Sequence, residues 1–279
     1  MKKNILIPTD FSKNAWEAIN YISEIYSQIP CEIHFANVYN FPGYITESAF
    51  VTIPSTDVYN EIRKLSITQL NKTIEKVKTQ FKNKLHTYHS ISEHNSLFSF
   101  IEDFVLNNNI DLIVMGTKGE TNSTDILYGS NTIDILQNIT KCPVLAIPEK
   151  VNFQIPKELV FATDFNKIDD YKKLEVLIEI AHLHNAKICV LHINKQEKLI
   201  VEQENNRAIL QDYLSKVAYE IRFLSNGDIH NSLSCFVQSR NSDLVAFFSK
   251  KHSLFENIFS KPLVKTMGEY SKVPVLVLH

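Results

Sequence analysis

The residues best suited to chemistry lie in one short segment of this sequence, MGTKGETNSTDILYGSNT, from Met115 to Thr132. Three of the chain's six glycines fall in it, Gly116, Gly119 and Gly129. Glycine tolerates positive φ and lets a backbone approach a ligand without interference from a Cβ atom. Ser130 follows the third glycine at the start of a predicted helix, whose first N–H groups and dipole favour an anion. The segment predicts a phosphate cradle; a loop with two tight turns and a helix N-cap is the alternative.

The elements around this segment follow from hydrophobic patterning. Short runs rich in Ile and Val predict strands buried on both faces, which are typical of parallel sheets. They span residues 4–8, 32–38, 111–116 and 143–148, with a less apolar edge strand at 84–91. Helical spacing of apolar residues lies between them, at 12–29, 58–81, 97–106 and 132–139. The alternation of strand and helix predicts a doubly wound α/β sheet.

The pattern restarts in the second half of the chain. Four segments recur in order: NILIPTDFS at 4–12 and ELVFATDFN at 158–166, CEIHFANVY at 31–39 and AKICVLHIN at 186–194, DLIVMG at 111–116 and DLVAFF at 243–248, KCPVLAIP at 141–148 and KVPVLVLH at 272–279. An ordered series of this kind indicates an internal duplication. We therefore predict two tandem doubly wound domains, residues 1–149 and 150–279.

A ligand site in such a sheet is expected beyond the carboxyl ends of the strands, at the switch point between oppositely wound neighbours. Pro8, Thr9 and Asp10 end the first strand there, and the glycine segment begins where DLIVMG ends. Asp10 could accept hydrogen bonds from ribose hydroxyls, or it could form an Asx turn before a Ser12 helix cap. The dinucleotide fingerprint and the Walker lysine signature are both absent from the sequence.

The glycine spacing resembles that of a known family. Gly116-x-x-Gly119, nine residues, then Gly129-Ser130 is the Gly-2x-Gly-9x-Gly-(Ser/Thr) pattern of ATP-binding universal stress proteins. ILIPTDFS, DLIVMGTKG and CPVLAIP stand in that family's order and spacing. Because the likeness covers both halves, the chain is similar to a tandem universal stress protein. The resemblance implies ATP as the ligand, with Mg²⁺, where present, held by the phosphates.

The resemblance also implies a role for each matching position. Thr9 and Asp10 would lie against adenine and ribose, and Val38 would frame the base through its backbone. The backbone from Met115 to Gly119 would contact ribose and phosphate, and the start of the following helix would hold the phosphates. The expected nucleotide-binding residues are Pro8, Thr9, Asp10, Val38, Met115, Gly116, Thr117, Lys118, Gly119, Gly129, Ser130, Asn131 and Thr132. For Lys118, a phosphate contact and a solvated side chain are both open.

The second half lacks the glycine pattern. Aligned with the first half, it places Phe248, Lys251 and Lys261-Pro262 where the first half has Gly116, Gly119 and Gly129-Ser130. Proline would also remove a donor N–H from the helix start. Thr163-Asp164 remains, but this pair supports the strand turn equally well. We therefore expect no ATP binding of the family's kind in the second half.

The chain's ten histidines show no metal-ligand spacing. His34 and His192 lie on echoing strands, and we expect both to be packed or hydrogen-bonded in preference to acting as ligands. No metal ligand is therefore expected among the protein side chains.

An insertion at 40–60 distinguishes the first half from the second. Tyr39, which precedes it, and Phe41, Tyr44 and Phe50 within it could cover the nucleotide or the joint between the halves. An ordinary surface loop is the alternative.

The composition indicates the cellular compartment and argues against some classes of binding partner. With 29 basic and 31 acidic residues, the chain carries no electrostatic footprint for nucleic acid or for an anionic membrane. Its four cysteines form no Cys-x-x-Cys pair, and three of them lie in apolar runs, which favours buried free thiols and a reducing compartment. Neither a signal peptide nor a membrane-length apolar run is visible. We expect a cytoplasmic protein without nucleic-acid or membrane partners.

The sequence is compatible with three functions. The first is a stress-response module that binds ATP in its first half and acts on a protein partner that the sequence does not name. The second is a slow ATPase or self-phosphorylating enzyme, with Thr121, Ser123 and Thr124 as acceptors. The third is a nucleotide-independent scaffold.

The resemblance also implies how the halves meet. In the family, the strands that match PVLAIP and PVLVL of two copies meet in a dimer. We therefore expect residues 144–147 to pair antiparallel with residues 275–278 about a pseudo-twofold axis. The resulting intramolecular pseudo-dimer could also form a further homodimer.

Overall fold

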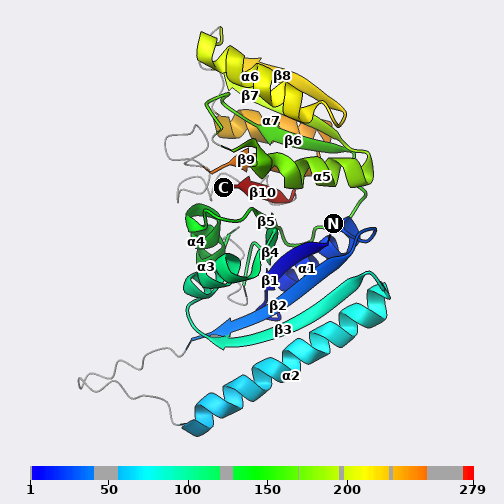
Figure 1. The fold of residues 1–279 in the computed structure, drawn as a ribbon, viewed down its shortest axis with the longest axis vertical. Coiled ribbons are helices and arrows are strands. Elements are labelled where there is room, and N and C mark those ends of the chain that lie inside the picture. The colour runs from blue at the N-terminus through cyan, green and yellow to red at the C-terminus, as the bar shows by residue number, and fades with distance from the viewer. Residues whose placement is uncertain are drawn as a thin grey trace, which may run out of the picture.

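One ten-stranded sheet runs through the computed structural model, which describes residues 2–40, 56–119, 128–168, 170–194, 198–225, 229–249 and 273–279 (Figure 1). The strands are β1 (Lys3–Pro8), β2 (Cys31–Tyr39), β3 (His86–His94), β4 (Leu112–Gly116), β5 (Val144–Ile147), β6 (Glu158–Ala162), β7 (Lys187–Asn194), β8 (Tyr219–Ser225), β9 (Leu244–Phe248) and β10 (Val275–Leu278). The helices are α1 (Lys13–Ile25), α2 (Thr56–Phe81), α3 (Leu97–Asn108), α4 (Ser130–Asn138), α5 (Glu175–His184), α6 (Val201–Leu214) and α7 (Ile229–Arg240), with a 3₁₀ turn η1 (Tyr171–Leu174) before α5.

The strand order confirms the predicted fold. It runs β3-β2-β1-β4-β5-β10-β9-β6-β7-β8, so the second half repeats the order of the first half in the opposite direction. Neighbours within each half are parallel, while β5 and β10 are antiparallel. Two doubly wound units thus meet about a pseudo-twofold axis at the centre of the sheet. The division at residue 149 stays a prediction, and it falls between β5 and β6.

The central joint is the predicted strand pair. Val275 stands opposite Ala146, Leu276 opposite Leu145, and Val277 opposite Val144. All residues of β5 and β10 are buried. This pairing satisfies the backbone groups of two apolar strands that would otherwise be sheet edges.

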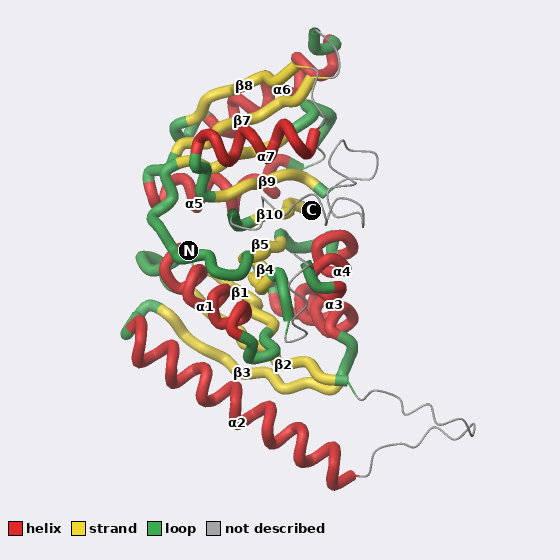
Figure 2. Tube along the Cα trace, turned by 180° about the vertical axis from the view of Figure 1, so that it is seen from behind, coloured by secondary structure: helices red, strands yellow, loops and turns green. Residues whose placement is uncertain are grey.

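Helices cover both faces of the sheet (Figures 1 and 2). Alternate residues of β1 point to opposite sides, so Ile5 and Ile7 share a core with the apolar stripes of α1 and α2, while Leu6 packs on the side of α3 and α4. In Figure 2, α2 runs along the edge formed by β3 and β2. Ser12 caps α1 as predicted, because its side chain accepts a hydrogen bond from the Ala15 N–H at 3.2 Å.

The sheet of the first half ends at the strand that the sequence predicts as its edge. The predicted edge strand at 84–91 is β3, which ends the sheet. Phe41, Tyr44 and Phe50 of the insertion lie outside the described residues, as does most of that insertion.

Within the described ranges, no helix has both the length and the apolar character that crossing a membrane would require.

The four cysteines are free thiols. Cys31, Cys142 and Cys189 are buried, as their apolar sequence context predicts, whereas Cys235 is exposed.

Candidate functional site

A cleft of about 160 Å³ opens at the carboxyl ends of β1, β2 and β4. It is lined by Pro8, Thr9, Asp10, Ala15, Ala36, Val38, Leu97, Met115, Gly116, Lys118, Gly119, Gly129, Ser130, Asn131 and Thr132. The structure therefore brings together every residue of the expected nucleotide-binding set except Thr117, which is buried beneath it. Ala15, Ala36 and Leu97 are additional wall residues that the sequence motif did not indicate.

The turn after β1 forms one wall of the cleft. The Phe11 N–H donates to the Thr9 hydroxyl oxygen at 3.0 Å, and the Ser12 N–H donates to Asp10 Oδ1 at 3.0 Å. Phe11 takes a left-handed conformation with φ 65°. Asp10 thus forms the Asx turn, which the sequence analysis gave as the alternative to ribose binding. Its second oxygen stands 3.0 Å from where a Cβ atom on Gly119 would lie, so the carboxylate also faces the glycine segment.

Gly116 allows close packing of the backbone, and the tolerance of glycine for positive φ is not used at the described glycines. No glycine among the described residues has a positive φ. A Cβ atom on Gly116 would lie 2.7 Å from Asn14 Oδ1 and 3.0 Å from the Asn14 backbone carbon. Gly116 ends a strand of the sheet, where its φ is ordinary, and its missing side chain allows α1 to approach β4.

Asn14 is a positioning residue that the sequence did not reveal. Its side chain is buried and donates to the Ile147 carbonyl oxygen at 3.0 Å. Its Oδ1 accepts from the Lys118 N–H at 2.9 Å. One amide therefore joins the start of α1 to the end of β5 and to the backbone that leaves β4. No motif singles out Asn14, because its importance depends on Gly116, which lies 102 residues later in the chain.

The two ends of the glycine segment are held together at the mouth of the cleft. The Gly129 N–H donates to the Thr117 carbonyl oxygen at 2.7 Å, and the Thr132 hydroxyl donates to the Gly116 carbonyl oxygen at 3.0 Å. These two groups are therefore used inside the protein. The start of α4 also offers the backbone N–H groups of its first turn, which have no acceptor within the helix, and the exposed side chains of Ser130 and Asn131.

The helix start is the feature of the cleft that favours an anion. Among the described residues that line it, Lys118 is the only basic side chain. Lys118 Nζ lies 3.0 Å from Glu149 Oε2, and the lysine side chain is only 14% exposed. The alternative of a solvated lysine is therefore wrong, and its charge is already paired.

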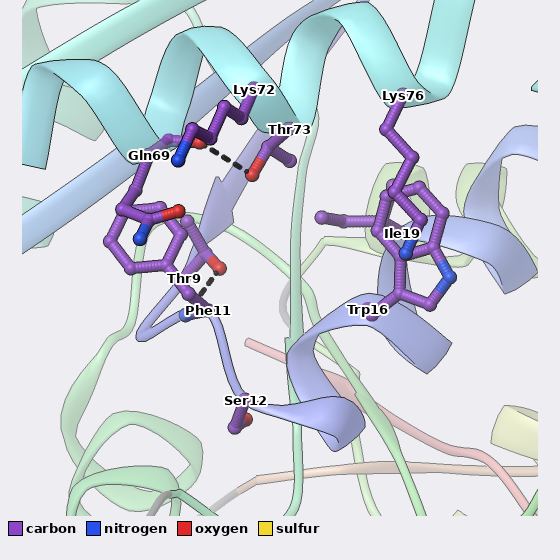
Figure 3. A pocket seen from close by; sticks show the side chains of 9 residues that line it. All are labelled: Thr9, Phe11, Ser12, Trp16, Ile19, Gln69, Lys72, Thr73 and Lys76. Atoms are coloured by element: carbon purple, nitrogen blue, oxygen red, sulfur yellow. Dashed lines mark hydrogen bonds between the residues drawn. The ribbon is translucent and has the colours of Figure 1, made fainter. Parts of the chain in front are cut away.

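A second cavity of about 180 Å³ lies between α1 and α2 (Figure 3). Figure 3 shows Lys72 and Lys76 reaching down from α2, and Lys76 Nζ stands 3.5 Å from the centre of the Trp16 ring. Thr9 belongs to both cavities, but it is the one member of the expected set that lines this second one. Most of the lining side chains belong to α1 and α2 and not to the strand ends, so the cleft at the strand ends is the candidate site.

The second half keeps the turn after its first strand, but a side chain fills the position that Gly116 holds in the first half. The Phe165 N–H donates to Thr163 Oγ1 at 3.1 Å, as its counterpart does after β1. Phe248, at the position of Gly116, is buried and packs edge-on against Phe161 at 5.8 Å. A large apolar side chain has thus replaced Gly116, while Lys251 and Lys261-Pro262 lie outside the described residues.

His192 is packed and hydrogen-bonded, as predicted. Its Nδ1 lies 2.8 Å from the Thr163 carbonyl oxygen, and its ring stacks on Phe165 at 4.8 Å. Burial is the main cause that lowers the pKa of this imidazole.

These features define a Rossmann-like α/β protein with a cleft at the switch point of its first half. The model of the Universal stress protein family matches residues 1–148, which is more than half of the sequence. The chain belongs to the universal stress protein family.

Individual relatives agree with this assignment. Universal stress protein MJ0577 of Methanocaldococcus jannaschii is 27% identical over 169 residues, which cover 54% of this chain and 97% of the relative. MJ0531 of the same organism is 30% identical over 148 residues, covering 52% and 81%. A crystal structure of a universal stress protein from Archaeoglobus fulgidus has a TM-score of 0.70 at 17% identity, covering 99% of this chain and 95% of that one. The fold of the family therefore extends over both halves.

Proposed function

We propose that the first half of this chain binds one adenine nucleotide, ATP, in the cleft at the ends of β1, β2 and β4. One observation carries the proposal: the first turn of α4 lines the same cleft as Asp10 and Gly119. A helix N-terminus favours an anion through its free N–H groups and its dipole, whereas a short carboxylate suits ribose hydroxyls. The cleft thus combines donors for phosphate with an acceptor for ribose hydroxyls, as a nucleotide requires.

In this proposal the phosphates contact the N–H groups of the first turn of α4 and the Ser130 hydroxyl. Asp10 accepts from the ribose, and the base packs among apolar wall residues such as Val38 and Met115. The described walls enclose about 160 Å³. This is less than the roughly 300–1,000 Å³ of typical ligand pockets, so the nucleotide would extend past them. Mg²⁺, where present, would be held by the phosphates.

The function that follows is a cytoplasmic stress-response module whose interaction with a protein partner depends on bound ATP. The acceptor residues of the enzymatic alternative, Thr121, Ser123 and Thr124, lie outside the described residues. No observation on the described part of the chain therefore favours self-phosphorylation over binding. The replaced Gly116 position supports a second half that does not bind ATP and serves as the partner of the first.

The direct test is to purify the full chain, denature it and identify any released nucleotide. We expect an adenine nucleotide in at most one equivalent. In parallel, ATP should raise the melting temperature of nucleotide-free protein by mass action. The proposal is contradicted if millimolar ATP leaves the melting temperature unchanged and no nucleotide co-purifies. Release of labelled inorganic phosphate, or label retained on the protein, would establish the enzymatic alternative.

A further inference from the structure

Two histidines and a glutamate gather on the β2–β3 edge of the sheet, away from the cleft. His34 of β2 stands directly opposite His89 of β3 in the strand register. Their rings stack with centroids 4.8 Å apart. Glu32 precedes His34 by two residues and so points to the same face. The ligand atoms of the three side chains all lie within 4.8 Å of one another.

This cluster is separate from the proposed nucleotide site. Both lie on the sheet face that carries α3, where His34 also packs edge-on against Phe104 at 5.5 Å. Ala36 and Val38, further along β2, line the cleft, whereas Glu32 and His34 lie toward the start of the strand. His89 is exposed and Glu32 and His34 are partly exposed, so an ion in solution can reach them.

We propose that Glu32, His34 and His89 bind one divalent transition-metal ion of the zinc type. Two imidazoles and one carboxylate, with a remaining position for water, are a common ligand set for Zn²⁺. Metal–ligand bonds of about 2.0–2.2 Å require ligand atoms closer together than these are in the metal-free arrangement. The exposed His89 side chain can supply the adjustment by rotating toward its partners.

The existing partner of Glu32 does not block a metal ion. Lys2 already pairs with Glu32 in an exposed ion pair, and such pairs are weak enough for a metal ion to displace.

The second half provides an internal comparison. In its register Cys189 stands opposite Glu220, as His34 stands opposite His89, and Lys187 takes the place of Glu32. Lys187 Nζ lies 3.1 Å from Glu220 Oε1, and Arg240 also approaches this oxygen at 2.7 Å. Fixed cations of the chain thus satisfy the glutamate there. The ligand set of the first half is therefore no requirement of the fold.

The test uses the full chain, stripped of metal and free of nucleotide, since nucleotides chelate metals. Zn²⁺ is titrated by calorimetry in competition with a chelator, and Co²⁺ absorption reports on the ligands. We expect one Zn²⁺ per chain. His89→Gln should weaken binding by about 100-fold or more, because changes even to residues behind the ligands cost about 10–100-fold. His182→Gln, at an exposed histidine of α5, is the matched control and should bind as the parent does.

Two further measurements keep the outcome decisive. The melting temperatures of metal-free His89→Gln and parent protein should agree, because the replaced side chain is exposed. Gly129→Val should retain Zn²⁺ binding, which separates this site from the nucleotide cleft. Equal Zn²⁺ affinity of His89→Gln and the parent, or no binding at micromolar Zn²⁺, would overturn the proposal.

Discussion

Asp10 and Asp164 form the same turn in the two halves but have different surroundings. In each, the carboxylate accepts from the N–H two residues on, at 3.0 Å. The second oxygen of Asp164 accepts from the Asn166 side chain at 2.9 Å, and the residue is buried. Asp10 is exposed and faces Gly119. The turn alone therefore does not make Asp10 a binding residue; its exposure and its position facing Gly119 do.

Asp10→Asn should weaken ATP binding while the turn persists, because an asparagine oxygen can also accept from Ser12. Hydrogen bonds to a charged group contribute about 1.5–3 kcal/mol, so the dissociation constant should rise about tenfold or more. Asp164→Asn is the matched control and should leave the affinity unchanged. Calorimetric titration of both variants with ATP makes the comparison, and equal affinities would remove Asp10 from the site.

Gly116→Ala should destabilise the first half. The added Cβ would stand 3.0 Å from the backbone of Asn14, so α1 has to shift. Overpacking of this kind typically costs about 1–3 kcal/mol. At Gly129 an added Cβ would meet only ordinary contacts, 3.7 Å from Thr117 O and 3.8 Å from Gly119 N. Urea unfolding should therefore show a clear loss for Gly116→Ala and little for Gly129→Ala; similar losses would refute this assignment of the two glycines.

At the scale of elements, the start of α4 is the feature on which nucleotide binding depends. Gly129→Val would place a branched side chain beside the first-turn donors, so ATP binding should be lost. The metal-free, nucleotide-free protein should melt nearly as the parent does, because the position has room for a Cβ atom. A thermal melt and an ATP titration of the same sample measure both effects, and an unchanged dissociation constant would place the phosphates elsewhere.

The sequence predicted elements better than contacts. Apolar runs identified the strands and their repetition, because burial on both faces leaves a direct trace in composition. Glycine spacing identified the segments that line the cleft. The contact of Asn14 with Gly116 and the pairing of Lys118 with Glu149 left no such trace, since each joins residues far apart in the chain. The same holds for His34 and His89, which meet across two strands and not within a local motif.

At the scale of the whole molecule, the β5–β10 pair holds the halves together. Residues 1–149 alone would expose β5, an apolar strand with unpaired backbone groups. We expect this fragment to dimerise or aggregate, whereas the full chain has its partner built in. Analytical ultracentrifugation across a range of concentrations distinguishes the two. A fragment that stays monomeric at high concentration would show that the joint is not needed to cover this edge.

The stability of the whole chain should fall in mild acid. Burial lowers the pKa of His279, which follows β10, to about 4, and Lys173 adds to the shift. An unfolded histidine has a pKa of about 6.5, so the unfolded state binds the proton more readily between these values. Stability is therefore full above pH 6.5 and is lost as the pH falls toward 4, by up to about 3 kcal/mol.

His279→Asn tests this origin of the pH dependence. Urea unfolding at pH 7 and pH 4.5 should show a smaller loss for the variant than for the parent. An equal loss in both would assign the acid sensitivity to other groups, such as His192, whose pKa is also lowered by burial.

Calorimetric titration of the nucleotide-free full chain with ATP measures nucleotide binding and its stoichiometry together. We expect one binding site per chain, because the α4 cleft exists in the first half while Phe248 fills the corresponding position in the second. Binding should vanish in Gly129→Val and persist in Asp164→Asn. Two equivalent sites, or binding that Gly129→Val leaves intact, would contradict the proposed ATP site.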